Sequence, residues 1–172
     1  MTDRYMGRYR IPSARLQNFD YGSNGMYFIT ICTKPRKPFL GSLEQGTLHP
    51  TRIGVVAIER WCKIAELYPF VALDAFQLMP DHLHAILGFD KPASGLDSSV
   101  VRSADLRSGG NFGPQRANLA SVIRGFKGAV KAYATTHGIP FGWQPRYHDR
   151  IIRNERQLNA TREYIRNNPL KG

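Results

Sequence analysis

Two histidines separated by one residue, His82 and His84, form the pattern with the most direct chemical meaning in this chain. On a β-strand, residues i and i+2 point to the same face, so both imidazoles would project together while Leu83 faces the other way. Two neutral imidazoles side by side can bind one divalent ion. A site with only two protein ligands is open, and an open site suits a hard ion that also holds a phosphate oxygen. The alternative is a pair of ordinary strand histidines, hydrogen-bonded or exposed.

Tyr164 and Asn168 form a second candidate pair, near the end of the chain. A spacing of four residues places both on one face of a helix, so a phenol and an amide oxygen would lie together. A tyrosine can act as a covalent nucleophile, and the amide oxygen could bind a metal. Because the ordinary pKa of a tyrosine is about 10, the phenol needs a nearby cation or a proton acceptor to ionise. The alternative is a core or surface tyrosine of an amphipathic helix.

The charge balance favours a polyanionic partner, with nucleic acid as the leading candidate. The 172 residues include 24 Lys and Arg against 13 Asp and Glu, a net charge of +11. Residues 116–172 alone carry 11 basic and three acidic residues, so we expect binding to concentrate there. The alternative is a basic but otherwise ordinary enzyme. Candidate phosphate contacts are Arg124, Lys127, Lys131, Arg146, Arg150 and Arg153, and Trp143, Tyr147 and His148 are candidates to stack on unpaired bases, although Trp143 fits a core position equally well.

The elements that must position these residues follow from hydrophobic periodicity and turn signals. We expect an α+β fold, a ferredoxin-like split β-α-β sandwich with a four- to five-stranded antiparallel sheet and helices on one face. A small hairpin is expected around Glu44-Gln45-Gly46. The predicted strands are Met26–Thr33, Val71–Met79, His82–Phe89 and one within Trp143–Ile152; the predicted helices are Thr51–Leu67, Leu119–His137 and Glu155–Asn167, the last capped by Asn154.

The length predicts a single domain, residues 21–172, preceded by a basic arm over residues 1–20. A stretch at about 90–118, rich in Ser, Gly, Pro and Arg, is expected to be a mobile insert. Cys32 and Cys62 form no CxxC motif and are predicted to be reduced core residues. No apolar run is long enough to span a bilayer and no secretory signal begins the chain, so we expect a cytoplasmic protein without a membrane partner.

Four segments together resemble the single-tyrosine HUH transposases, most closely the branch associated with repetitive extragenic palindromes (REP) within the IS200-like superfamily. The likeness runs from about Tyr27 to Gly172, and the first and last of the segments are specific when they occur together in this order. The segments are FQLMPDHLHAILGF, LASVIRGFKGAVKAY, WQPRYHDRIIRNERQL and EYIRNNPLKG.

The resemblance implies roles for four residues. His82 and His84 match the histidines that bind a divalent ion, Mg or Mn, Tyr164 matches the catalytic nucleophile, and Asn168 matches a third metal ligand. The implied activity is that of an endonuclease and strand transferase that cuts single-stranded DNA beside imperfect palindromic hairpins through a 5′-phosphotyrosine intermediate. The implied protein is a nucleoid-associated bacterial monomer or homodimer.

Two other functions remain open on the sequence. One is a non-catalytic module that binds nucleic-acid hairpins, in which the histidines and Tyr164 are structural. The other is a hydrolytic metallonuclease that uses water, which is disfavoured because no carboxylate cluster is evident for a second metal.

Overall fold

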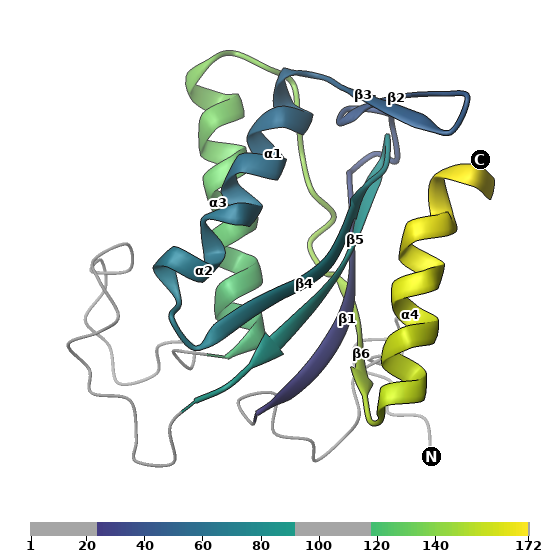
Figure 1. Cartoon of the computed structure of the whole chain (residues 1–172). Helices are drawn as coiled ribbons and strands as arrows, with labels where there is room; N and C mark the ends of the chain where they lie inside the picture. Colours follow the sequence, from purple (N-terminus) through teal and green to yellow (C-terminus); the bar gives the residue numbers. More distant parts are fainter. Residues whose placement is uncertain (1–23, 92–117, 172) are drawn as a thin grey trace, which may run out of the picture.

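A computed structural model describes residues 24–91 and 118–171 (Figure 1). The arm predicted for residues 1–20 and most of the insert predicted near 90–118 lie outside the described residues. The elements, in chain order, are β1 (Gly25–Cys32), β2 (Gly41–Glu44), β3 (Thr47–Pro50), α1 (Arg52–Cys62), α2 (Ile64–Leu67), β4 (Val71–Leu78), β5 (His82–Phe89), α3 (Leu119–Thr136), β6 (His148–Ile152), α4 (Glu155–Asn167) and a short 3₁₀ helix, η1 (Asn168–Lys171).

Four strands form one antiparallel sheet in the order β4-β5-β1-β6, as the predicted fold class requires. His84 of β5 lies opposite Thr30 of β1, and Arg150 of β6 lies opposite Phe28 of β1. Because paired residues point to the same face and i, i+2 residues share a face, this register puts all four side chains on one side of the sheet. Among the described strands, β6 lies at one edge of this sheet.

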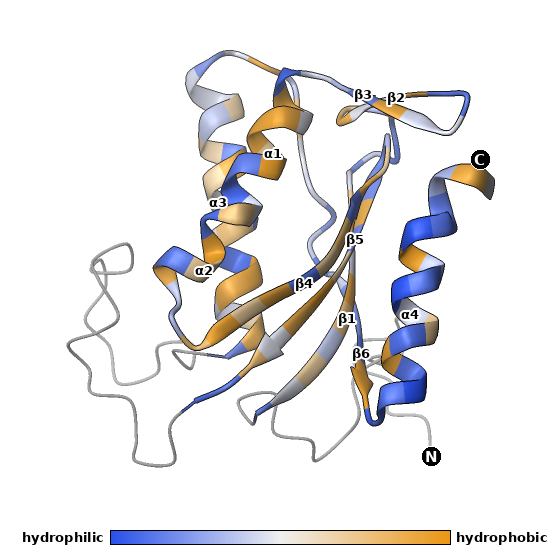
Figure 2. Cartoon of the chain, in the orientation of Figure 1, coloured by the Kyte–Doolittle hydropathy of each residue, from blue (hydrophilic) through white to orange (hydrophobic). Residues whose placement is uncertain are grey.

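Helices cover both faces of the sheet. α1 and α3 lie on one face, and α4 lies on the other (Figure 1). The prediction of helices on one face is therefore wrong for α4. The physical reason is that β5 is apolar on both sides: Leu83 and Ala85 belong to the main core, whereas Ile86 is fully buried in a second cluster with Ile152 and Ile165 of α4. A face with buried apolar residues needs its own cover, and α4, otherwise mainly hydrophilic in Figure 2, supplies it.

Helix boundaries follow local capping signals. The Asn154 side chain accepts a hydrogen bond from the Gln157 backbone N–H at 2.9 Å, and α4 has the predicted bounds. The Asn118 side chain accepts from the Ser121 N–H at 2.9 Å, which starts α3 at the predicted residue. The single helix predicted over Thr51–Leu67 is instead divided at Lys63 (φ −71°, ψ −11°) into α1 and α2.

Two smaller expectations have different outcomes. The predicted hairpin is confirmed: β2 and β3 join through Gln45 (φ 48°) and Gly46 (φ 76°), the two positive φ angles of a tight hairpin turn. Cys32 is buried as predicted, but Cys62 is exposed, because Trp61 and Ile64 occupy the buried side of the helical segment there. Among the described helices, none combines the length and apolarity that crossing a bilayer requires.

Candidate functional site

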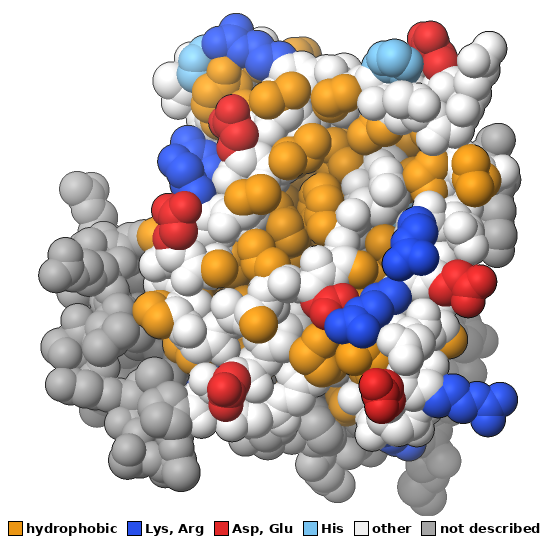
Figure 3. Space-filling model, in the orientation of Figure 1, with side chains coloured by type: hydrophobic (Ala, Val, Ile, Leu, Met, Phe, Trp, Pro, Cys, Tyr) orange, Lys and Arg blue, Asp and Glu red, His pale blue; other side chains and the backbone are white. Residues whose placement is uncertain are grey.

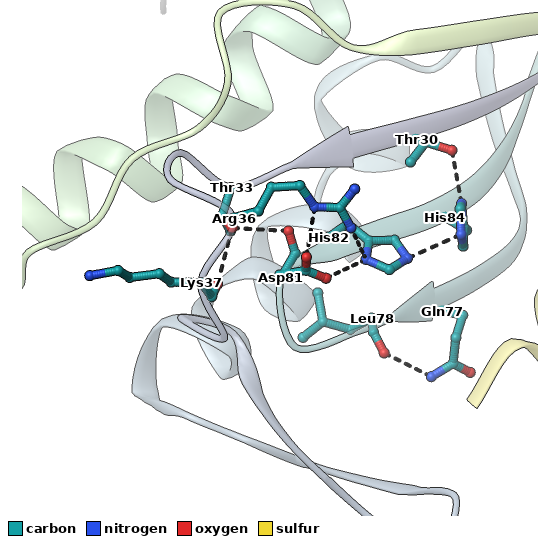
Figure 4. A network of polar contacts seen from close by, with 9 residues as sticks. All are labelled: Thr30, Thr33, Arg36, Lys37, Gln77, Leu78, Asp81, His82 and His84. Atoms are coloured by element: carbon teal, nitrogen blue, oxygen red, sulfur yellow. Dashed lines mark hydrogen bonds and ion pairs between the residues drawn. The ribbon is translucent and has the colours of Figure 1, made fainter. Parts of the chain in front are cut away.

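The two histidines converge on the face of the sheet that α4 covers. Their Nε2 atoms lie 3.2 Å apart and their ring centroids 4.7 Å apart (Figure 4). The i, i+2 spacing on β5 accounts for the shared face, and the antiparallel partner β1 supplies Thr30 beside His84. The expectation that both imidazoles project together is therefore met in the structure.

The other ring nitrogen of each histidine is held by a neighbour, which orients the Nε2 atoms. His82 Nδ1 lies 2.6 Å from Asp81 Oδ1, and His84 Nδ1 lies 2.8 Å from Thr30 Oγ1. Because a carboxylate only accepts, His82 donates its Nδ1 proton to Asp81 and keeps the Nε2 lone pair. Arg36 Nε in turn donates to Asp81 Oδ2 at 2.7 Å. Burial alone would raise the pKa of Asp81, but the hydrogen bonds from Arg36 and His82 hold it below its usual value.

Burial keeps His84 neutral near pH 7. Burial first, and then electrostatic repulsion from the neighbouring His82 and Arg36 sites, lowers the pKa of His84 to about 4. A neutral imidazole with an oriented lone pair is a metal ligand, whereas an imidazolium is not. His84 is therefore neutral at physiological pH, which is the charge state that metal ligation requires.

This shift predicts a pH-dependent contribution to stability in metal-free buffer. Between pH 6.5 and about 4, the unfolded chain takes up a proton at His84 that the folded chain does not, so stability falls as the pH falls. At roughly 1.4 kcal/mol per pKa unit, the loss attributable to His84 is about 3 kcal/mol. Urea denaturation with a chelator present, at pH 6.5 and 4.5, should show a smaller loss for His84→Gln than for the wild type. Equal losses in the two proteins would contradict the assignment.

The donor set fits a divalent ion in an open site. Two nitrogens 3.2 Å apart are close enough to bind one ion at metal–nitrogen distances of about 2.1 Å. Within residues 24–91 and 118–171, no third His, Cys, Asp or Glu joins them, so further ligands must be of another kind. Asn168, the predicted third ligand, is the first residue of η1 and is half-buried, and no described contact joins it to either imidazole.

Tyr164 lies on the same side of the sheet, next to the histidines. Its ring centroid is 5.4 Å from that of His84 and 6.0 Å from that of Phe28, and 43% of the residue is exposed. Phe28 also stacks on His84 at 5.5 Å. A partly exposed phenol therefore lies beside two converging imidazole nitrogens, although Tyr164 follows His84 by 80 residues in the chain.

An ion pair between β4 and α4 holds the Tyr164 helix in place. Arg162 Nε donates to Asp74 Oδ1 at 2.8 Å, and its Nη2 donates to Oδ2 at 2.5 Å. Asp74 lies where the register of β4 shifts, between Leu73 and Phe76. The hydrogen bond from Arg162 lowers the pKa of Asp74, despite partial burial. Sequence reasoning missed this pair because its members are 88 residues apart and no local pattern links them.

Replacing Asp74 by alanine should loosen the attachment of α4. We expect a loss of about 1 kcal/mol in the free energy of unfolding, the upper range for a partly exposed pair. Because the folded-state pKa of Asp74 is lowered, the contribution is present above about pH 4 and lost as the pH falls through the folded pKa. Urea denaturation of Asp74→Ala at pH 7 and pH 3 checks both points. The matched control is Glu163→Ala, which removes an exposed carboxylate from the same helix.

The predicted DNA-contacting residues divide between the two faces of the sheet. On the α4 face, the Arg150 guanidinium lies 5.7 Å from the Phe28 ring, and exposed His148 stands opposite Thr30. Arg150, Arg153 and Tyr164 line a cavity of about 560 Å³ together with Gln157, Ala160 and Thr161. Figure 3 shows Lys and Arg side chains over α4, interspersed with Asp and Glu.

On the α3 face, two of the predicted phosphate contacts instead bind the protein backbone. Lys127 Nζ donates to the carbonyl oxygens of Gln144 (2.6 Å) and Pro145 (3.3 Å), and Lys131 Nζ donates to that of Phe141 (2.6 Å). Burial lowers the pKa of Lys127. These lysines tie α3 to the segment before β6, a role that helical spacing could not reveal.

The remaining four predicted contacts lie near this segment or on α3. Trp143 is half-buried and packs against Phe126 and Phe141. Tyr147 is half-buried at the edge of the core, and Arg124 and Arg146 are exposed. The structure thus brings the histidines, Tyr164 and Arg150 together, and gathers Trp143, Tyr147 and Arg124 at a separate place on the opposite face.

Comparison with known proteins supplies a family and a fold. No protein-family model matches the chain. It is 32% identical, over 174 residues, to a Haemophilus influenzae protein described as uncharacterized, and the alignment covers 99% of this chain and 94% of the relative. The chain belongs to the same family as this protein.

The chain shares its fold with a solved transposase. The structure of a REP-associated tyrosine transposase bound to a REP hairpin matches with a TM-score of 0.57, over 86% of this chain and 67% of that chain, at 20% identity. The expected fold is therefore confirmed: this chain has the fold of that solved transposase.

Proposed function

We propose that the protein cleaves and transfers single-stranded DNA beside hairpins, with Tyr164 as the nucleophile and a divalent ion, Mg or Mn, held by His82 and His84. The observation that supports this most strongly is the position of the Tyr164 ring 5.4 Å from His84, whose Nε2 converges with that of His82. If Tyr164 had only a structural role, its position would not require two converging imidazole nitrogens beside the ring. Asn168 is the candidate for a third protein ligand, since it follows Tyr164 by about one helical turn.

Tyr164 supplies the nucleophile for the proposed covalent step, in which the bonds formed and broken and the protons transferred balance. Tyr164 Oη attacks the phosphorus of a phosphodiester, the bond from phosphorus to the 3′-oxygen breaks, and the DNA 5′ end stays on Tyr164 as a phosphotyrosine. The phenol loses its proton to solvent, which reaches the exposed ring, and the leaving 3′-oxygen gains one. The bound ion would act as a Lewis acid on a non-bridging oxygen of the phosphate. Attack by another 3′-hydroxyl reverses the step and joins the strands.

The positive charge around the site favours the same substrate. Arg150 and Arg153 line the cavity that includes Tyr164, where a cation can bind a DNA phosphate. The Phe28 ring contacts Arg150, His84 and Tyr164. These contacts place the candidate phosphate-binding group and the proposed nucleophile in one cluster. The solved structure of similar fold is bound to a REP hairpin, which supports a hairpin as the substrate.

The test is an incubation of the full chain with end-labelled hairpin DNA that carries single-stranded flanks, with Mg²⁺ or Mn²⁺. We expect a protein-linked DNA band on a denaturing gel, no such band with excess chelator, and its return when the metal is restored. Hairpin binding with neither cleavage nor adduct would indicate the non-catalytic binding module. Cleaved DNA without any adduct would indicate hydrolysis by water.

A further inference from the structure

The contact between the two imidazoles determines where their protons lie. His82 Nε2 and His84 Nε2 are at hydrogen-bonding distance, 3.2 Å, so when both rings are neutral one nitrogen donates and the other accepts (Figure 4). His82 Nδ1 donates its proton to the Asp81 carboxylate at 2.6 Å, because a carboxylate only accepts. A neutral imidazole carries a single ring N–H, so His82 Nε2 is the acceptor and His84 Nε2 is the donor.

The same count gives the direction of the hydrogen bond between His84 and Thr30. With its proton on Nε2, neutral His84 has a lone pair at Nδ1, which lies 2.8 Å from Thr30 Oγ1. The Thr30 hydroxyl therefore donates to His84. His82 and His84 are thus opposite tautomers, since the first carries its proton at Nδ1 and the second at Nε2.

A divalent ion shared by the two rings requires the other tautomer of His84. Each Nε2 atom must present a lone pair to the ion, so the proton at His84 Nε2 has to leave. The ring stays neutral only if Nδ1 gains a proton, and this buried N–H then needs an acceptor. The Thr30 oxygen can take that role once its own proton rotates away, because a hydroxyl both donates and accepts.

The fold holds the Thr30 hydroxyl against His84. Thr30 of β1 is the cross-strand partner of His84 on β5, so both side chains point to the same face of the sheet. Phe28 stacks on the His84 ring, Tyr164 packs edge-on against it, and His84 is only 6% exposed. Solvent therefore has little access to His84 Nδ1, and the hydroxyl is the group that must pair with it.

We propose that Thr30 is a positioning residue for the metal site, whose hydroxyl donates to His84 Nδ1 in metal-free buffer and accepts from it when a divalent ion is bound. The proton at Nε2 goes to solvent and another enters at Nδ1, so the charge of the ring does not change. Asp81 permits one tautomer of His82, whereas Thr30 permits both tautomers of His84. This rests on the proposed function for the presence of the ion, but not on cleavage.

NMR of the ring nitrogens reads the tautomer of each imidazole directly. Spectra of the wild type are recorded with a chelator and then with Zn²⁺, a diamagnetic ion that imidazole binds well. The His84 signals are identified by their loss in His84→Gln. We expect the His84 proton at Nε2 with the chelator and at Nδ1 with Zn²⁺, while the His82 proton stays at Nδ1. A His84 tautomer that is the same in both conditions overturns the proposal.

Calorimetric titration with Mn²⁺ tests the hydroxyl itself. Thr30→Val keeps the branched shape but leaves the His84 Nδ1–H of the metal-bound form without an acceptor, so the Kd for Mn²⁺ should rise about 10- to 100-fold. Thr30→Ser keeps a hydroxyl and should restore a Kd near the wild-type value. Thr47→Val is the matched control, because Thr47 is an exposed strand threonine on β3, and it should leave the Kd unchanged. Thermal melting should show the three variants folded.

The results separate the role of Thr30 from catalysis. A folded Thr30→Val protein with wild-type Mn²⁺ affinity overturns that role, even if the wild type forms the protein-linked DNA band. A weaker affinity that serine fails to restore would assign the effect to packing and overturn it as well. Weaker affinity that serine restores supports the role of Thr30 even if the wild type forms no band, which would remove the catalytic proposal alone.

Discussion

Tyr164→Phe should abolish the protein-linked DNA band and lower cleavage by about four orders of magnitude or more, the scale seen when an enzyme loses its nucleophile. The substitution removes one hydroxyl and keeps the ring that packs on Phe28 and His84, so the site should keep its shape. Binding of the hairpin, which depends on the basic side chains, should change little. Cleavage is measured by denaturing gel and binding by titration of labelled DNA.

Tyr133→Phe is the matched control, because Tyr133 lies on α3 and its hydroxyl accepts a hydrogen bond from Arg52, away from the histidines. It should cleave at the wild-type rate. Mass spectrometry of the wild-type adduct should place the DNA on the peptide that contains Tyr164. An adduct that persists in Tyr164→Phe, or that maps to another tyrosine, would show the nucleophile to be wrongly assigned.

His82→Ala should lower cleavage by about three orders of magnitude, since a bound metal contributes several kcal/mol of charge stabilisation to phosphoryl transfer. It removes one of the two converging nitrogens and leaves Asp81 paired with Arg36. His82 is partly accessible and makes no large contribution to the core, so the fold should survive. Calorimetric titration with Mn²⁺ should show weaker metal binding, while the hairpin Kd stays near the wild-type value.

The control for this variant is His49→Ala, which removes an exposed imidazole on the β2–β3 hairpin. It should leave both metal binding and cleavage unchanged. Wild-type cleavage by His82→Ala, in buffer with the same metal concentration, would mean that the paired histidines are structural. Reduced cleavage with unchanged Mn²⁺ affinity would assign His82 a role other than ligation.

The local patterns of the chain predicted the elements well and, with them, part of the candidate site. The strand His82–Phe89 and the helix Glu155–Asn167 have the predicted bounds, because alternation, an Asn cap and a following Pro act over a few residues. The shared face of His82 and His84 also follows from a two-residue repeat. Such signals are short in range, and they are set by backbone geometry whatever the rest of the fold does.

The surroundings of those residues depended on contacts between distant parts of the chain. Arg36 reaches Asp81 across 45 residues and Arg162 reaches Asp74 across 88, and no local repeat encodes either distance. The same holds for Lys127, which the sequence offered as a candidate phosphate contact but whose ammonium binds carbonyl oxygens of another segment.

Among the features that depend on distant contacts, the side of the sheet on which α4 packs matters most for the candidate site. The apolar positions of α4 show that it must be buried somewhere, and only the second apolar face of the sheet, at Ile86 and Ile152, places it opposite α1 and α3. That choice brings Tyr164 to the histidines. Periodicity specifies which side of an element is apolar, whereas the burial of complementary surfaces in three dimensions selects the partner that covers it.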